Sequence, residues 1–219
     1  MCPCSGRRCG VMADLLAVLA AYLMGSIPFA QLLSTRRGID LRRVGSGNVG
    51  ASNVLRTLGV RPAVLAMMLD AVKGTVAVLI AQRLTNGVAA PVMAGLASMI
   101  GHVYPVWLRF RGGKGVATAA GVFAVLAPVA AAAAAGAFLL TVALTRFISV
   151  GSMVAALTLA GWAIASDAPR IVGVGATIGA ALVLIGHRAN VLRLVAGTER
   201  RVGQRGIRES AYGRGMPRP

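Results

Sequence analysis

Three polar segments interrupt an otherwise apolar chain, at residues 45–56, 101–118 and 186–199. Each combines glycine with cationic or amide side chains and lies beside a long apolar stretch. Flexible, cationic backbone next to hydrocarbon is costly unless it lines a site. Backbone N–H, guanidinium and ammonium groups are the groups that hold phosphate. We therefore expect the three segments to bind anions.

The first polar segment contains Gly45-Ser46-Gly47-Asn48-Val49-Gly50, which matches the G-x-G-x-x-G pattern of dinucleotide-binding loops. Such a loop follows a buried strand, whereas here an arginine-rich stretch precedes it, so the nucleotide interpretation fails. The small residues still expose N–H groups, and a helix starting near Ser52 would point its positive end at an anion. A glycine-rich turn with solvated arginines is the alternative. The candidate ligands are Ser46, Asn48, Asn53 and Arg56.

The second polar segment carries Gly112-Gly113-Lys114-Gly115 directly before an apolar stretch. It is not a Walker A loop, because Gly115 rather than serine or threonine follows Lys114. The glycine N–H groups and the Lys114 ammonium would converge at a helix N-terminus, which predicts a phosphate nest at the membrane interface. His102, earlier in the segment, is expected to make a structural hydrogen bond at a helix end.

The third polar segment places His187, Asn190 and Arg193 at intervals of three residues. On a helix they would share roughly one face. A histidine and an amide on one face can hold a substrate hydroxyl or an acyl oxygen. A polar face that reaches toward the membrane interface would give the same spacing.

Three further candidate residues, two of them charged, lie outside these segments. Asp70 and Lys73 lie three residues apart in an apolar stretch, so they can pair along a helix. Charges at membrane depth favour a functional interpretation, and a neutralised structural pair fits equally well. Ser152 follows a basic turn and suits a helix cap or a substrate contact.

The composition is that of a membrane protein. Hydrophobic residues make up 57% of the 219 residues and charged residues 13%, whereas soluble domains carry about 25% charged residues. The net charge of +17 fits loops beside anionic lipid and binding of anionic substrates. Basic residues are not interleaved with aromatic ones as in a base-stacking surface, so nucleic acid is not an expected partner.

Seven apolar stretches predict an all-α integral membrane protein, a seven-span helical bundle. They lie at residues 12–34, 61–82, 88–108, 115–127, 128–145, 150–166 and 170–187. Pro128 divides what would otherwise be one long helix, and five or six spans are the alternative. With the N-terminus outside and the C-terminus cytoplasmic, most Lys and Arg fall inside, together with all three polar segments.

One membrane domain is expected at residues 12–199. A disordered leader at 1–11 would precede it, and a basic cytoplasmic tail at 200–219 would follow. All three cysteines fall in the leader, without the further ligands that a metal site needs, so no metal is expected.

Together, the three polar segments resemble those of the bacterial acyl-phosphate:glycerol-3-phosphate acyltransferases, the PlsY family. Gly25-Ser26-Ile27-Pro28-Phe29-Ala30 and Asp70-Ala71-Val72-Lys73-Gly74 also match. The resemblance implies a seven-span bundle of the bacterial cytoplasmic membrane, with its active site at the cytoplasmic face and no cofactor. It further implies acyl transfer from acyl phosphate to the 1-hydroxyl of sn-glycerol 3-phosphate, which gives lysophosphatidate and phosphate.

The residue chemistry and the resemblance together assign the site residues. The catalytic group would be His187, Asn190 and Lys114. The residues expected to bind substrate are Ser46, Asn48, Asn53, Arg56, Gly112, Gly113, Lys114, Ser152, His187 and Asn190.

Positioning and electrostatics can suffice for this reaction, because an acyl phosphate already carries a good leaving group. We expect direct attack by the glycerol hydroxyl, with either the substrate's own phosphate or His187 as the base. A transporter or exchanger of phosphorylated solutes is the rival interpretation, although the chain has no inverted repeat. A lipid-binding scaffold is the third interpretation, for which the glycine-rich segments would be superfluous.

Overall fold

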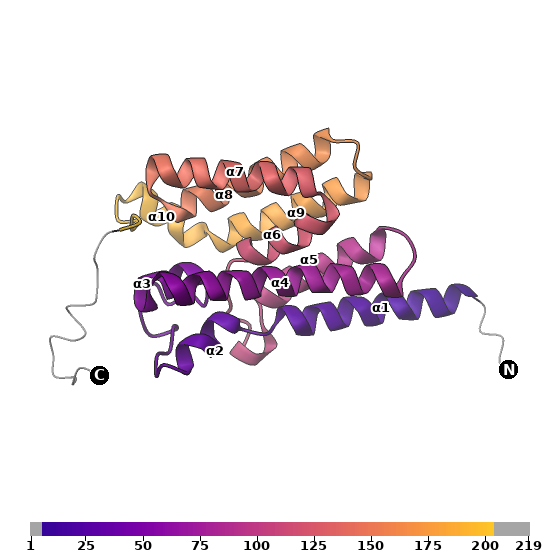
Figure 1. The fold of residues 1–219 in the computed structure, drawn as a ribbon, viewed down its shortest axis with the longest axis horizontal. Coiled ribbons are helices and arrows are strands. Elements are labelled where there is room, and N and C mark those ends of the chain that lie inside the picture. The colour runs from indigo at the N-terminus through magenta and orange to yellow at the C-terminus, as the bar shows by residue number, and fades with distance from the viewer. Residues whose placement is uncertain (1–5, 204–219) are drawn as a thin grey trace.

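The apolar stretches of the sequence form helices in the computed structural model, which describes residues 6–203 (Figure 1). Among these residues no strand occurs, which confirms the all-helical prediction. The helices are α1 (Gly6–Gly25), α2 (Phe29–Thr35), α3 (Ala51–Leu58), α4 (Val60–Leu84), α5 (Ala89–Val103), α6 (Val116–Leu126), α7 (Pro128–Thr145), α8 (Ile148–Ala165), α9 (Arg170–Gly186) and α10 (Arg188–Val195), with a short 3₁₀ turn at Val106–Leu108.

Two prolines divide stretches that hydropathy alone would join. Pro128 begins α7, so the predicted boundary between residues 127 and 128 is confirmed. Pro28 precedes α2, and the stretch predicted at 12–34 is broken there into α1 and α2. A proline lacks the N–H that would continue the helix ladder, which accounts for both breaks.

The number of spans is lower than predicted when judged by length and composition. Among residues 6–203, 5 stretches are long and apolar enough to cross a membrane, counting α1 with α2 as one, and up to 6 if α9 and α10 form one broken span. Helix α6 is not among these stretches, because its 11 residues reach only about 16 Å, whereas the hydrocarbon core is about 30 Å thick. The seven-span count and the orientation of the termini stay predictions.

Helix α6 lies between two groups of helices. It contacts α4 and α5 on one side and α7 and α9 on the other, while α1 packs on α4 and α5, and α8 packs on α7 and α9 (Figure 1). Glycines permit the closest of these contacts: a Cβ on Gly121 would lie 1.9 Å from the carbonyl oxygen of Ala71. Small residues at helix crossings are the usual basis of close packing in membranes.

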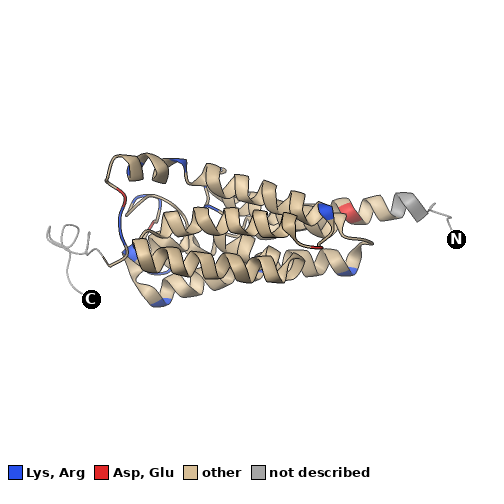
Figure 2. Ribbon diagram, turned by 90° about the horizontal axis from the view of Figure 1, so that it is seen from above, with Lys and Arg blue, Asp and Glu red and all other residues tan. Residues whose placement is uncertain are grey.

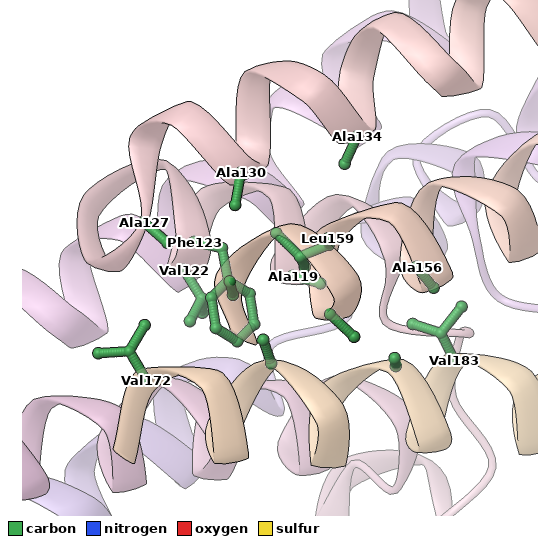
Figure 3. Close-up of a cluster of buried hydrophobic side chains, with 14 of the residues drawn as sticks. Ala119, Val122, Phe123, Ala127, Ala130, Ala134, Ala156, Leu159, Val172 and Val183 are labelled. Carbon is green, nitrogen blue, oxygen red and sulfur yellow. The ribbon is translucent and has the colours of Figure 1, made fainter. Parts of the chain in front are cut away.

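The largest apolar core forms where α6 meets α8 and α9. Phe123 and Val122 of α6 are fully buried there, and Leu159 of α8 and Val183 of α9 belong to the same cluster (Figure 3). Helix α7 contributes Ala130 and Ala134 to the same core. Because α6 is packed on several sides by other helices, little of this short helix is left to face lipid.

The two ends of the bundle differ in charge. Figure 2 shows Lys and Arg gathered mainly at the end that carries the C-terminus. The predicted leader is helical from residue 6 onward, since α1 begins at Gly6. Residues 1–5 of the leader and residues 204–219 of the predicted basic tail lie outside the described residues.

Candidate active site

The first polar segment is held together by Asn53. This side chain is fully buried, and its Oδ1 accepts a hydrogen bond from the Ser46 N–H at 2.9 Å. Its Nδ2 donates to the carbonyls of Leu41 and Val44 at 3.1 and 3.0 Å. Gly45 has a φ of +63°, and a Cβ there would lie 2.1 Å from the Asn53 oxygen. The amide is thus engaged by the loop itself, so Asn53 holds the loop, and its predicted contact with substrate stays a prediction.

The glycines of the second polar segment also serve the fold. The N–H groups of Gly112 and Gly113 donate to the carbonyls of Val103 and His102, both at 3.0 Å. These two N–H groups are thus engaged within the loop, and the predicted binding of substrate by Gly112 and Gly113 stays a prediction. The N–H groups left for an anion are those of the first turn of α6, which begins after Gly115.

The structure brings the three polar segments together. Asn48 of the first donates through Nδ2 to the Gly112 carbonyl of the second at 3.5 Å. Lys114 of the second donates through Nζ to Oδ1 of Asn190 in the third. A Cβ on Gly186 would touch the Lys114 stem at 3.5 Å, so the third segment also packs against the lysine.

Glu199 is a buried acceptor at the centre of this cluster. Its Oε1 accepts hydrogen bonds from Ser149 of α8 at 3.0 Å and from Nδ2 of Asn190 at 2.8 Å. Its Oε2 accepts from Arg193 at 2.8 Å. Burial alone would raise the pKa of Glu199, but the hydrogen bonds from Arg193, Asn190 and Ser149 outweigh burial and hold it below the usual value.

Sequence reasoning missed the role of Glu199, although one signal was present. It is the only acidic residue in any of the three polar segments. A single carboxylate among arginines, a lysine and amides is a natural internal partner for them.

His187 lies at the junction of α9 and α10, where the chain bends by 53°. The residue is 2% exposed, and Nδ1 of its ring lies 2.8 Å from the carbonyl oxygen of Val183. Because a carbonyl only accepts hydrogen bonds, Nδ1 carries the proton, and Nε2 of the neutral ring is an acceptor.

Helix α10 has two unlike faces. Asn190 is buried in the cluster, whereas Leu192 and Val195 are 72% and 85% exposed. The predicted common face of His187, Asn190 and Arg193 is confirmed in part, since Asn190 and Arg193 both bond to Glu199. The other face of α10 is open and exposes Leu192 and Val195 together with Arg188.

Ser152 lies one turn into α8, away from these hydrogen bonds. It is buried, and its hydroxyl donates to the Ile148 carbonyl within its own helix at 2.9 Å. Ser149, nearer the start of α8, is the serine that reaches the cluster. The predicted substrate contact of Ser152 stays a prediction.

The cationic groups perturb one another. The pKa of Lys114 is lowered to about 8, mainly by burial; the Glu199 carboxylate opposes this shift, and the positive charges of Arg193 and Arg56 add to it. Burial likewise lowers the pKa of Arg56, whose neighbours include Glu199 and Arg193. Arg56 of α3 therefore lies within electrostatic range of Glu199 and Arg193, as Lys114 does.

The pairing of Asp70 and Lys73 is confirmed. Nζ of Lys73 lies 2.8 Å from Oδ1 of Asp70, and both side chains are 2% exposed. Nδ1 of His102 lies 3.5 Å from the same carboxylate oxygen. Within residues 6–203, no group of three or more His, Cys, Asp or Glu is arranged to hold a metal ion.

Known proteins match this chain over nearly its full length. A family model described as glycerol-3-phosphate acyltransferase matches residues 15–197. The chain belongs to the glycerol-3-phosphate acyltransferase family. The family's enzyme from Myxococcus xanthus is 47% identical over 187 residues, which cover 84% of this chain and 97% of that one. The enzyme from Desulforamulus reducens is 41% identical over 195 residues, which cover 89% and 98%.

Solved structures of the family share the fold. The glycerol 3-phosphate form of PlsY, an integral membrane glycerol 3-phosphate acyltransferase, superposes with a TM-score of 0.83 at 40% identity, over 87% of this chain and 96% of that chain. Its lysophosphatidic acid form gives a TM-score of 0.81 at 38% identity, over 87% and 95%. The predicted family is therefore confirmed, and the chain is a multi-pass bacterial membrane protein.

Proposed function

We propose that this glycerol-3-phosphate acyltransferase moves an acyl group from acyl phosphate to the 1-hydroxyl of sn-glycerol 3-phosphate. The products are lysophosphatidate and phosphate. The observation that carries the proposal is the contact of Lys114 with Asn190, which joins two glycine- and cation-rich segments in one partly buried site. The glycerol 3-phosphate and lysophosphatidic acid forms of PlsY support the acceptor and the product.

The cationic groups suit two phosphates, one on each substrate. Lys114 and Arg56 both lie within the field of Glu199 and are partly withdrawn from water. Partial burial strengthens their attraction to phosphate oxygens. We assign phosphate binding to Lys114, Arg56 and Ser46, with the first turn of α6 adding N–H groups.

The chemical step is direct attack. The glycerol hydroxyl oxygen forms a bond to the acyl carbon, the bond from that carbon to the phosphate oxygen breaks, and its electrons leave with phosphate. Asn190 keeps one amide hydrogen for a substrate oxygen, because the other donates to Glu199. The hydroxyl proton passes to a phosphate oxygen of the substrate or to Nε2 of His187, which is an acceptor in the tautomer set by Val183.

The proposal extends to topology. The N-terminus would lie outside and the C-terminus inside, with the cluster at the cytoplasmic face. Helix α6 would be a short crossing that brings the total to seven. The concentration of Lys and Arg at the C-terminal end of the bundle supports this orientation (Figure 2). The acyl chain would lie among lipids between helices.

Purified protein in detergent or lipid, supplied with palmitoyl phosphate and glycerol 3-phosphate, tests the function. We expect phosphate release that requires both substrates, with lysophosphatidate formed in equal amount. Folded protein that releases no phosphate would contradict the proposal. Uptake of glycerol 3-phosphate into vesicles without acylation would instead favour a transporter.

A further inference from the structure

A buried ionic group stands apart from the proposed chemistry. Asp70 and Lys73 of α4 form an ion pair with side chains 2% exposed, and His102 of α5 faces the same carboxylate. Removing charges from water is costly even when they are paired, and a well-packed apolar replacement is often as stable. The stability of the bundle alone therefore does not account for this group.

Lys73 reaches the break between α1 and α2. Its Nζ donates to the Ile27 carbonyl at 2.9 Å, directly before the proline that ends the helical ladder. The same ammonium lies 5.7 Å from the centre of the Phe29 ring. Lys73 thus fixes the break to α4.

His102 contacts the glycine loop that follows it in the second polar segment. Its carbonyl accepts the N–H of Gly113 at 3.0 Å. A Cβ on Gly113 would lie 2.1 Å from Nε2 of its ring, and a Cβ on Gly112 would lie 2.1 Å from its carbonyl oxygen. The two glycines that precede Lys114 are therefore packed directly on His102.

A small cavity adjoins all of these elements. Its lining includes residues 25–30 at the helix break, the ionic group, and the two glycines. The break, the ion pair and the glycine loop are thus parts of one local structure.

We propose that Asp70, Lys73 and His102 are positioning residues that set the place of the Gly112-Gly113 loop and, through it, of the Lys114 ammonium. Asp70 orients His102, His102 supports the glycines, and Lys73 ties Asp70 to the helix break. The inference rests on the proposed function insofar as Lys114 binds a substrate phosphate.

The competing explanation is simple charge compensation, and a double substitution separates the two. D70N and K73M each leave one buried charge without its partner, whereas D70N/K73M leaves none. Under charge compensation the double variant regains both stability and function. Under positioning it regains stability but not function, because the Ile27 carbonyl has lost its donor and His102 faces a neutral amide in place of a carboxylate.

The experiment compares wild type, the three variants and R83M, a control at the exposed end of the same helix. Three quantities are measured: the unfolding temperature in detergent, the affinity for inorganic phosphate, and kcat/KM. We expect D70N/K73M to unfold within a few degrees of wild type, to bind phosphate more weakly, and to lose about 10- to 100-fold in kcat/KM. R83M should match wild type in all three.

Wild-type phosphate affinity and kcat/KM in D70N/K73M would overturn the inference. If this variant does not fold, His102→Leu and His102→Gln are measured instead. Phosphate affinity and kcat/KM that are lost in His102→Leu and recovered in His102→Gln would support positioning. Wild-type values in both variants would overturn it. Phosphate affinity keeps the two proposals apart. Suppose that the wild type transfers no acyl group but the variants still bind phosphate more weakly than the wild type does. That result would contradict the proposed function and leave the positioning role supported.

Discussion

Asn190 accepts a hydrogen bond from the ammonium of Lys114, although 76 positions separate them in the chain. The same amide donates to Glu199, so one side chain connects a cation to an anion. Such a bridge fixes the amide plane and leaves one of its hydrogens for a substrate oxygen. The cluster is therefore ordered before substrate arrives, which is the condition for electrostatic catalysis.

Replacing Lys114 should abolish most activity without unfolding the protein. In K114M we expect kcat/KM to fall by about 100- to 1000-fold, the range for removal of one preorganised donor. K114R should recover part of it, because the charge is kept while the geometry changes. Phosphate release measures the loss, and the unfolding temperature serves as the control. Near-normal turnover in K114M would remove the lysine from the mechanism.

The pH dependence of the enzyme should report the ammonium of Lys114. With a pKa of about 8, the group is charged at neutral pH and loses its proton above that value. We expect kcat/KM to fall as the pH rises through about 8. In K114R this alkaline decline should disappear, because arginine keeps its proton beyond about pH 12. An unchanged decline in K114R would assign it to another group.

The neighbours of Lys114 should move this decline in opposite directions. Glu199 raises the lysine pKa and Arg56 lowers it. We therefore expect E199Q to shift the decline to lower pH and R56M to shift it to higher pH. Rate profiles between pH 6 and 10, about two units on either side of the lysine pKa, would resolve the shifts. Shifts of the same sign would contradict the arrangement of charges.

Asn53 should prove structural. N53A removes three hydrogen bonds from a fully buried side chain, so we expect a loss of about 2–3 kcal/mol in stability, seen as a lower unfolding temperature. S52A, on the same helix, is the matched control. Full stability in N53A with a raised KM would instead restore the predicted role in binding.

Two glycines offer a matched comparison. A Cβ on Gly113 would lie 2.1 Å from His102 Nε2, whereas nothing lies within 4 Å of one on Gly136 of α7. We expect G113A to displace the loop and lower kcat/KM by about tenfold or more, since small misplacements are costly in catalysis. G136A should be neutral or slightly stabilising, because alanine favours helix over glycine. Equal kinetics for both variants would exclude a tight contact at Gly113.

The helices and the meeting of the polar segments could be predicted because hydropathy and charge are properties of local sequence. Pro128 marked its boundary, and the three-residue spacing placed Asn190 and Arg193 together. The fate of individual polar groups could not be predicted. Asn53 and the Gly112 and Gly113 N–H groups bind backbone carbonyls whose positions depend on the tertiary fold. The length of α6 likewise gave no sign that other helices would surround it.

The open face of α10 has a consequence for kinetics. With Leu192 and Val195 exposed beside a bend, α10 is suited to lie along the membrane interface, with Asn190 turned toward the reaction. A donor with a fatty tail would then reach the site by lateral diffusion in the lipid. Turnover should follow the mole fraction of donor in the bilayer, so adding inert lipid at constant total donor should slow the enzyme.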